Sequence, residues 1–172
     1  MPALGLSSGS VHLHAYEDEW PRLFLAERAL LLSCLGDEAL EIEHVGSTAI
    51  RGMPAKPILD ISVAVSSFED AVRCVPLLEE IGYAFRGEQG IPRRHFFVKG
   101  DPVTHHLHML EADSEPLVAM LRFRDYLLEH PDVAAAYAAL KFDLAQQHSN
   151  DRVAYTDGKT SFVQGVLGQA SR

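Results

Sequence analysis

Several features that mark specialised classes of protein are scarce or missing in this sequence. No apolar run approaches the ~20 residues that a membrane-spanning helix needs. Only 2 cysteines occur among 172 residues, and Cys34 and Cys74 both fall at apolar positions of predicted helices. This placement favours buried free thiols over a disulfide or a metal site. The N-terminus lacks a basic region followed by an apolar core, so it does not resemble a secretory signal, and we expect a cytoplasmic protein without a membrane partner.

Repeats, low-complexity segments and linkers are missing as well. We therefore expect one domain over residues 11–172, preceded by a flexible tail at residues 1–10. Hydrophobic residues make up 47% of the sequence, which is typical of an ordinary globular protein and argues against disorder. Acidic residues outnumber basic ones, so the net charge is -9. This argues against broad electrostatic binding to nucleic acid but leaves room for a small basic pocket.

The apolar residues follow two different periods along the chain. Alternation predicts strands at residues 11–16, 41–45, 58–65, 83–86, 93–99 and 103–111. Helical spacing is found from Trp20 to Cys34, from Ser67 to Gly82, after Pro116, after Pro131 and from about Gly158 to Gly168. Pro76 predicts a kink or break in the second of these helices. Strands and helices interleave up to residue 111, so we expect a mixed α/β layer with the C-terminal helices packed on it.

The strand predicted at residues 58–65 carries a carboxylate on its polar side. Because side chains alternate along a strand, Asp60 and Ser62 point away from the apolar face that must join the core. Asp60 therefore faces a cleft or a second layer. There it could bind a divalent metal ion and, through the ion, the oxygens of a polyphosphate. The alternative is a solvated or salt-bridged aspartate.

Gly46-Ser47-Thr48 follows the strand predicted at residues 41–45. Small residues let backbone N–H groups approach a phosphate, and a hydroxyl donates a further hydrogen bond. The alternative is a tight turn in which Ser47 or Thr48 caps a helix. Lys56, in the loop before Asp60, could pair with that carboxylate or with an anion, although lone lysines are usually solvated.

Two histidines lie on one side of a later predicted strand. His106 and His108 are two residues apart, so both face the same way, whereas His105 faces the other way. Two imidazoles at that spacing can share a metal ion or a phosphate. The alternative is a pair of ordinary polar strand positions.

Cationic residues supply further candidates. Arg94 precedes Phe96, and an arginine fork suits a phosphate while an aromatic ring could stack a base. The simpler interpretation is a charged strand entry beside core phenylalanines. Arg124 lies at an otherwise apolar helical position, which predicts a buried carboxylate partner. Lys141 and Lys159 are candidates for reaching across to the cleft.

These residues together resemble the GrpB family, which belongs to the nucleotidyltransferase-like superfamily. The resemblance covers nearly the whole chain and is densest in IEHVGSTAIRGMPAKPILDI, from Ile42 to Ile61. Further matching residues are Tyr16 with Trp20, HLHML at His106 to Leu110, FRDYL at Phe123 to Leu127, YAALK at Tyr137 to Lys141, and Tyr155 with Lys159. The resemblance implies a nucleotidyltransferase-like fold, which is a small mixed sheet flanked by helices.

The resemblance also implies a site. In that superfamily a Gly-Ser pair holds nucleotide phosphates, and two carboxylates one residue apart, with a third on a later strand, hold two magnesium ions. On this chain the pair falls on Gly46 and Ser47, and the first carboxylate falls on Asp60. Ser62 occupies the place of the second carboxylate, and the later strand offers histidines. The chain therefore departs from the pattern where two-metal transfer needs negative charge.

We accordingly expect a protein that binds a nucleotide or another phosphorylated small molecule, with magnesium at Asp60, and that supports nucleotidyl or phosphoryl transfer. The residues expected to act are Asp60 and His108 in catalysis, and Gly46, Ser47, Thr48, Lys56, Arg94 and His106 in ligand binding. The first alternative is a non-catalytic metabolite-binding or regulatory module. A second is a hydrolytic metal site on His106, His108 and Asp60. Similar domains also occur fused to dephospho-coenzyme A kinase, which suggests coenzyme A species as further ligands to test.

Overall fold

A five-stranded mixed sheet forms the centre of the computed structural model, which describes residues 4–7 and 10–171. Its strands lie in the order β1-β2-β5-β4-β3. They are β1 (Glu41–Val45), β2 (Leu59–Val65), β3 (Tyr83–Phe85), β4 (Arg94–Lys99) and β5 (His105–Glu111). β2 and β5 run parallel, and every other neighbouring pair is antiparallel. The expected small mixed sheet is confirmed.

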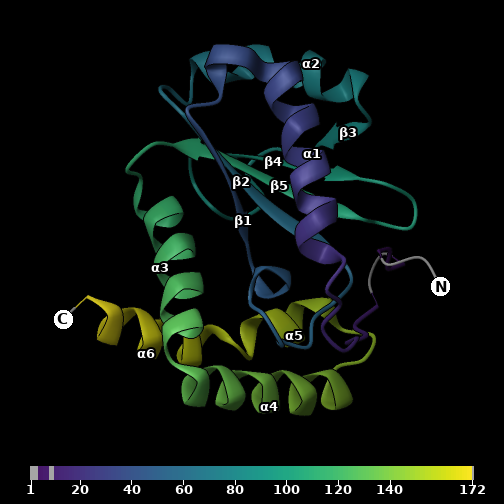
Figure 1. Ribbon diagram of the computed structural model, residues 1–172, viewed down its shortest axis with the longest axis vertical. Helices are drawn as coiled ribbons and strands as arrows, with labels where there is room; N and C mark the ends of the chain where they lie inside the picture. The colour runs from purple at the N-terminus through teal and green to yellow at the C-terminus, as the bar shows by residue number, and fades with distance from the viewer. Residues whose placement is uncertain (1–3, 8–9, 172) are drawn as a thin grey trace.

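Helices flank this sheet on both faces and gather at one end of it (Figure 1). They are α1 (Trp20–Leu35), α2 (Cys74–Glu80), α3 (Glu115–Glu129), α4 (Pro131–Gln147), α5 (Arg152–Asp157) and α6 (Thr160–Ala170). Short 3-10 turns occur at η1 (Gly36–Glu38), η2 (Ser47–Ala49) and η3 (Asp70–Arg73). The predicted packing of the C-terminal helices on the α/β layer is confirmed, with α4, α5 and α6 beneath the loop that contains η2 (Figure 1).

The alternation along β2 decides which of its side chains enter the main core. Leu59, Ile61 and Val63 are fully buried on the face that α1 and α2 cover. On the opposite face Ala64 packs beneath Leu117 of α3. This cover does not reach the beginning of the strand, and the Asp60 side chain keeps 31% of its surface exposed there. The fold therefore leaves one end of a buried strand open to a ligand.

Several predicted elements differ from the observed ones. Residues 11–16 do not form a strand; His14 makes one isolated bridge with Ala55, because Val11 packs instead between α4 and α5. The helix predicted from Ser67 is broken, as Pro76 suggests, but the break lies earlier and Pro76 falls in the first turn of α2. The last predicted helix is present as α6, whereas the short helix α5, which precedes it, was not predicted.

The structure describes only part of the predicted N-terminal tail, and only one of the two cysteines is fully buried. Residues 1–3 and 8–9 of the predicted tail lie outside the described residues, whereas Leu6 pairs with Val103. Both cysteines are free, Cys74 is buried and Cys34 is half-buried. Within residues 4–7 and 10–171, no helix combines the length and the apolar character needed to cross a membrane.

Candidate functional site

A cavity of about 300 Å³ lies where β2 and β5 begin, between the loop that follows β1 and the C-terminal helices. Polar and charged side chains from four separated segments line it. They are Ser47, Thr48, Lys56, Asp60, His106, His108, Tyr137, Lys141, Arg152, Tyr155, Thr156 and Lys159, beside Gly46. The structure thus brings the predicted residues of the central stretch together with the two histidines and with Lys141 and Lys159.

Gly46 allows the loop to pass directly over Asp60. Its backbone has φ 70° and ψ -172°, a combination that only glycine adopts without strain. A Cβ atom at this position would lie 2.7 Å from Asp60 Oδ2. The chain then turns through η2, which has no side-chain cap, so the alternative role of Ser47 or Thr48 as a helix cap is not what the structure shows.

The two hydroxyls of this turn have different partners. Lys141 Nζ donates to Ser47 Oγ over 2.9 Å, so Ser47 faces the cavity. Thr48 is buried, and its Oγ1 lies 2.9 Å from His44 Nε2. Burial lowers the pKa of His44 to about 4, so this imidazole stays neutral at physiological pH. Thr48 therefore ties the turn to β1 while Ser47 remains available to a ligand.

Two arginine–histidine pairs converge on the Asp60 carboxylate. Arg152 Nη2 lies 3.2 Å from His106 Nε2, and Arg94 Nη1 lies 3.1 Å from His108 Nδ1. Guanidinium groups only donate hydrogen bonds, so each of these ring nitrogens must accept. The other nitrogen of each neutral ring then carries the hydrogen and donates it to Asp60 Oδ1, over 3.1 Å from His106 and 3.3 Å from His108.

This arrangement sets the protonation state of Asp60. Burial acts to raise the pKa of its carboxyl group, but the hydrogen bonds from His106 and His108 outweigh burial and hold the pKa well below its usual value. Burial also lowers the pKa of His108, against the opposing effect of Asp60. Asp60 is therefore a permanent anion and a weak base at neutral pH.

Four cationic side chains face this single carboxylate. Lys56, Arg152 and Lys159 are half-buried in the cavity wall, and Lys141 is buried. Burial, followed by the neighbouring positive charges, lowers the pKa of Lys56 to about 8 and the pKa of Lys141 to about 7. The pKa of Lys159 is lowered mainly by burial. Crowding of this kind is costly without an anion, because each charge disfavours the others.

Two tyrosine rings lie close to the ammonium groups of the three lysines. Lys159 Nζ and Lys56 Nζ lie 4.4 Å and 5.5 Å from the centre of the Tyr155 ring, and Lys141 Nζ lies 5.0 Å from that of Tyr137. These distances are within the range of cation–π attraction. Burial raises the pKa of Tyr155 to about 12, so its phenol stays protonated and offers a hydrogen-bond donor.

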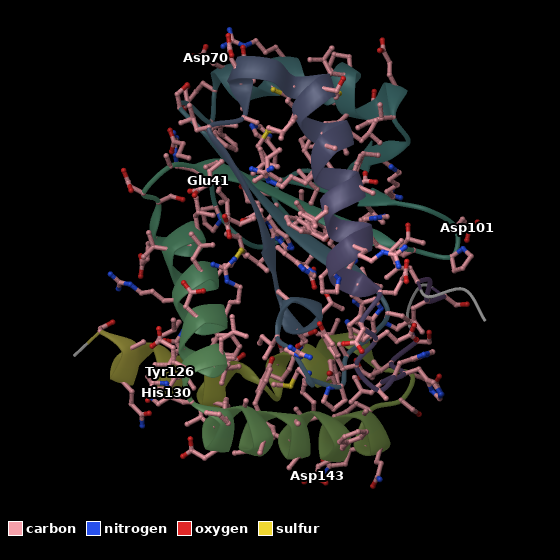
Figure 2. All side chains as sticks on the ribbon, in the orientation of Figure 1. Glu41, Asp70, Asp101, Tyr126, His130 and Asp143 are labelled. Atoms are coloured by element: carbon pink, nitrogen blue, oxygen red, sulfur yellow. The ribbon has the colours of Figure 1, made fainter. Side chains whose placement is uncertain are left out.

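The charge of the cavity lining is opposite in sign to the net charge of the protein. The net charge of the chain is -9, and Figure 2 shows exposed acidic side chains at its periphery: Asp70 beside α2, Asp101 in the turn after β4, and Asp143 on the outer side of α4. The cavity is lined by Lys56, Lys141, Arg152 and Lys159 beside one carboxylate. A small basic pocket, which the sequence left open, is therefore present in a protein of negative net charge.

The side chains around Asp60 do not fit the pair of magnesium ions that the family resemblance implies. Ser62 is buried and pairs in register with Glu43 and His108. Glu43 forms an ion pair with Arg124, with 2.6 Å between Glu43 Oε2 and Arg124 Nη1. This ion pair confirms the prediction that Arg124 has a carboxylate partner. Both nitrogens of each histidine are occupied, as is Asp60 Oδ1. Within the part of the chain that the structure describes, no group of three or more His, Cys, Asp or Glu residues is arranged to hold a metal ion.

Arg94 does not take the place expected for it, and Arg152 lines the cavity in its stead. Arg94 is buried behind His108, where it donates to the carbonyl oxygens of Glu88 and Gln89, and it does not line the cavity. Arg152 does line it but was not singled out in the sequence. It belongs to the short helix α5, which the pattern did not predict. The nearest signal was the Tyr155–Lys159 match in the same segment.

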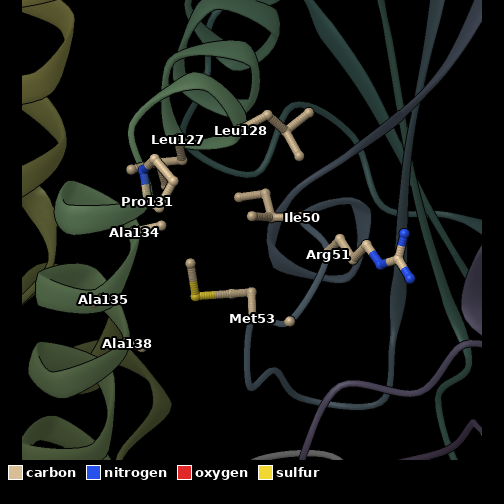
Figure 3. Close-up of a pocket in the computed structure, with 10 residues that line it drawn as sticks. Ile50, Arg51, Met53, Leu127, Leu128, Pro131, Ala134, Ala135 and Ala138 are labelled. Carbon is tan, nitrogen blue, oxygen red and sulfur yellow. The ribbon is translucent and has the colours of Figure 1, made fainter.

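A second cavity of about 250 Å³ lies on the other side of the same loop. Figure 3 shows Ile50 and Met53 facing Leu127 and Pro131 across it, whereas the Arg51 side chain points away. Apart from Arg51 and Gly52, the residues that line it are apolar. Its side chains therefore suit an apolar group better than a charged substrate.

Comparison with known proteins agrees with this architecture. The model of the GrpB protein family matches residues 10–169. A UPF0157 protein of Pseudomonas aeruginosa is 43% identical over 159 residues, which are 88% of this chain and 64% of that protein. The UPF0157 protein YqkA of Bacillus subtilis is 37% identical over 94% of this chain, which spans only 48% of its length. The crystal structure of the conserved protein GrpB from Enterococcus faecalis aligns with 92% of this chain, with 34% identity and a TM-score of 0.86. The aligned region makes up 96% of the Enterococcus chain. On this match along nearly its whole length, the chain belongs to the GrpB protein family.

Proposed function

We propose that the cavity binds the phosphate portion of a nucleotide or of another phosphorylated small molecule. The observation that carries this proposal is the gathering of Lys56, Lys141, Arg152 and Lys159 around one carboxylate in a chain of net charge -9. An anion relieves the mutual repulsion of these cations. Phosphate oxygens suit both the arginine fork and the lysine ammonium groups.

The phosphate closest to the loop would sit at Gly46 and Ser47. The Lys141 ammonium has three N–H groups, of which two are donated to Ser47 Oγ and to the Pro54 carbonyl oxygen. The third remains for a phosphate oxygen. Tyr155 and Lys159 would contact the ligand from the opposite wall of the cavity. The remainder of the molecule, such as a nucleoside, would extend towards the cavity mouth.

A binding role without catalysis is the second candidate. It is favoured by Asp60, whose Oδ1 receives two hydrogen bonds and whose low pKa makes it a weak base. Transfer of label from radioactive ATP to candidate acceptors separates the two roles. Turnover that is lost in Asp60→Asn would support transfer, whereas binding without turnover across the acceptor panel would support the regulatory module.

Thermal stabilisation by a panel of nucleotides and coenzyme A species tests the proposal. A ligand at 100 times its Kd adds about 2.7 kcal/mol to the free energy of unfolding, or roughly 5–10 °C in Tm for a chain of this size. We expect Arg152→Gln to weaken binding roughly tenfold, as the loss of one charge-assisted hydrogen bond does. The matched control is Arg122→Gln, which removes an exposed arginine on α3. No shift with any member of the panel would contradict the proposal.

Ligand affinity should fall as the pH rises above about 7. The pKa values of Lys141 and Lys56, about 7 and about 8, return towards the ordinary lysine value when an anion binds. Bound protein then holds protons that free protein has lost, so binding takes up protons and weakens with rising pH. The charged and titratable groups that face these two amines are Lys159, Arg152, Asp60, Tyr137 and Tyr155. Calorimetry in buffers of different ionisation enthalpy measures the uptake; release of protons would contradict the prediction.

A further inference from the structure

We infer that the cavity binds a diphosphate or triphosphate group whose charge is neutralised by protein side chains, without a metal ion. This inference rests on the proposed function and narrows it to a class of ligand. It departs from the two-magnesium chemistry that the family resemblance implies. Three features of the cavity support it. The side chains that could bind a metal ion are already hydrogen-bonded, the cavity holds several cations, and these cations are distributed along it.

The first feature is that the donors a metal ion would use are already hydrogen-bonded. Asp60 Oδ1 accepts from His106 and His108, and the second nitrogen of each ring accepts from an arginine. To bind a metal ion, an imidazole would have to lose its arginine or its carboxylate partner. Ser62, at the place of the second carboxylate, is neutral and only 2% exposed. Magnesium prefers carboxylate and phosphate oxygens, and Asp60 Oδ2 alone remains for it.

The second feature is the number of positive charges. Lys56, Lys141, Arg152 and Lys159 face one carboxylate, which leaves an excess of three positive charges when all four are protonated. A phosphate monoester carries only about 1.5–2 negative charges at neutral pH. One phosphate therefore leaves part of the cavity charge unbalanced, whereas a second phosphate in the same molecule offsets it.

The third feature is that the cations are spread along the cavity. Lys141 contacts Ser47 at one end, and Arg152 contacts His106 at the other. Lys56 and Lys159 share the Tyr155 ring. A single phosphate group is too compact to satisfy four cations that approach from three segments of the chain. A chain of phosphates presents anionic oxygens along its length and can be contacted by each of them.

Magnesium should weaken this interaction. The ion coordinates polyphosphate oxygens in solution and removes two units of negative charge from the ligand. Side-chain cations then gain less from contact with it, and the ion brings positive charge into a cavity that already repels cations. A site built around metal ions would behave in the opposite way, because the metal would bridge the ligand to Asp60.

Calorimetric titration of the full chain provides the test. The probes are AMP, ADP, ATP and inorganic pyrophosphate, each in excess EDTA and in excess magnesium. In EDTA we expect ADP, ATP or pyrophosphate to bind on the order of tenfold more tightly than AMP, as one added charge-assisted contact predicts. Magnesium should reduce that affinity. Lys159→Gln should remove most of the preference for two phosphates over one, whereas the exposed substitution Arg122→Gln should leave it unchanged.

The outcomes separate the inference from the proposed function. Binding that requires magnesium, or AMP binding as tightly as ADP, would overturn the inference while the proposed function stands. Failure of every probe to bind in either condition would overturn both. Retention of the phosphate preference in a folded Lys159→Gln protein would also count against the inference, because Lys159 is one of the cations on which it rests.

Discussion

Replacing Lys141 with methionine is expected to weaken ligand binding strongly while leaving the protein folded. Lys141 is 1% exposed and is the cation that contacts Ser47. Hydrogen bonds to charged groups contribute about 1.5–3 kcal/mol, so the lost phosphate contact alone should weaken binding roughly 10- to 150-fold. The Ser47 hydroxyl loses the Lys141 ammonium as a hydrogen-bond donor, which adds to this effect. Calorimetric titration with the ligand found in the nucleotide panel measures the change.

The stability of the Lys141→Met protein should change little. The Pro54 carbonyl oxygen loses its donor, which costs about 1–3 kcal/mol if it stays unpaired. Against this, methionine fills a similar volume and removes an ammonium group buried near other cations. Arg122→Met, at an exposed position of α3, is the matched control for the change from cation to thioether. A Lys141→Met protein that binds as tightly as the unaltered chain would contradict the assignment of this lysine to the ligand.

The same variant should also change how stability depends on pH. The pKa of Lys141 in the folded chain is lowered to about 7, whereas in the unfolded chain it keeps the ordinary lysine value of 10.5. Between these values the unfolded state binds more protons, so the free energy of unfolding of the ligand-free protein rises with pH. Lys141→Met should lack this part of the slope. Urea unfolding at pH 7 and pH 9 measures it, and an unchanged slope would show that Lys141 is not desolvated as the structure indicates.

Gly46→Ala should produce the largest loss of stability among single substitutions in the loop. The backbone at Gly46 has φ 70° and ψ -172°, which costs another residue about 1–3 kcal/mol. The added methyl group would also lie 2.7 Å from Asp60 Oδ2 and 2.9 Å from Asp60 Cβ. The loop or the carboxylate must shift to relieve this contact, so we expect ligand binding to be lost as well. Chemical denaturation and the nucleotide titration test the two effects.

Gly52→Ala is the matched control for this substitution. Gly52 lies in the same loop with φ 80°, but nothing stands within 4 Å of the Cβ that alanine would add. It should therefore show only the backbone cost and retain binding. Equal losses in the two variants would indicate that backbone strain alone is responsible. In that case the close approach of the loop to Asp60 would not be needed for the site.

Much of the candidate site follows from local pattern. Alternation along β2 and β5 predicted that Asp60 points away from the core and that His106 and His108 face the same way as each other, because the two-residue period of a strand is independent of the rest of the fold. The parallel pairing of these strands then places Asp60 directly beside His106. The same kind of reasoning predicted a carboxylate partner for Arg124, because a charged residue on an apolar helical face must be paired to be buried.

The sequence named Lys141 as a candidate for reaching across to the cleft, but the contacts that this lysine and Arg152 make came only from the tertiary structure. Arg152 and Lys141 lie 46 and 94 positions from the residues they contact, and no local period relates groups so far apart. Their approach depends on how α4 and α5 pack under the loop, which is decided by side-chain fit among apolar residues. The short helix α5 has too few residues for an apolar pattern to reveal it.

By itself, then, the sequence determined the sheet, the polar face of β2, the turn at Gly46 and the membership of a family. It also identified a carboxylate at the start of a buried strand. Only the tertiary structure decided what that carboxylate can do, because its chemistry depends on donors brought from distant segments. Two histidines, each held by an arginine, donate to one oxygen of this carboxylate, and four cations line the same cavity. These contacts are the physical reason why we propose an anionic ligand for a site at which the family resemblance implied magnesium.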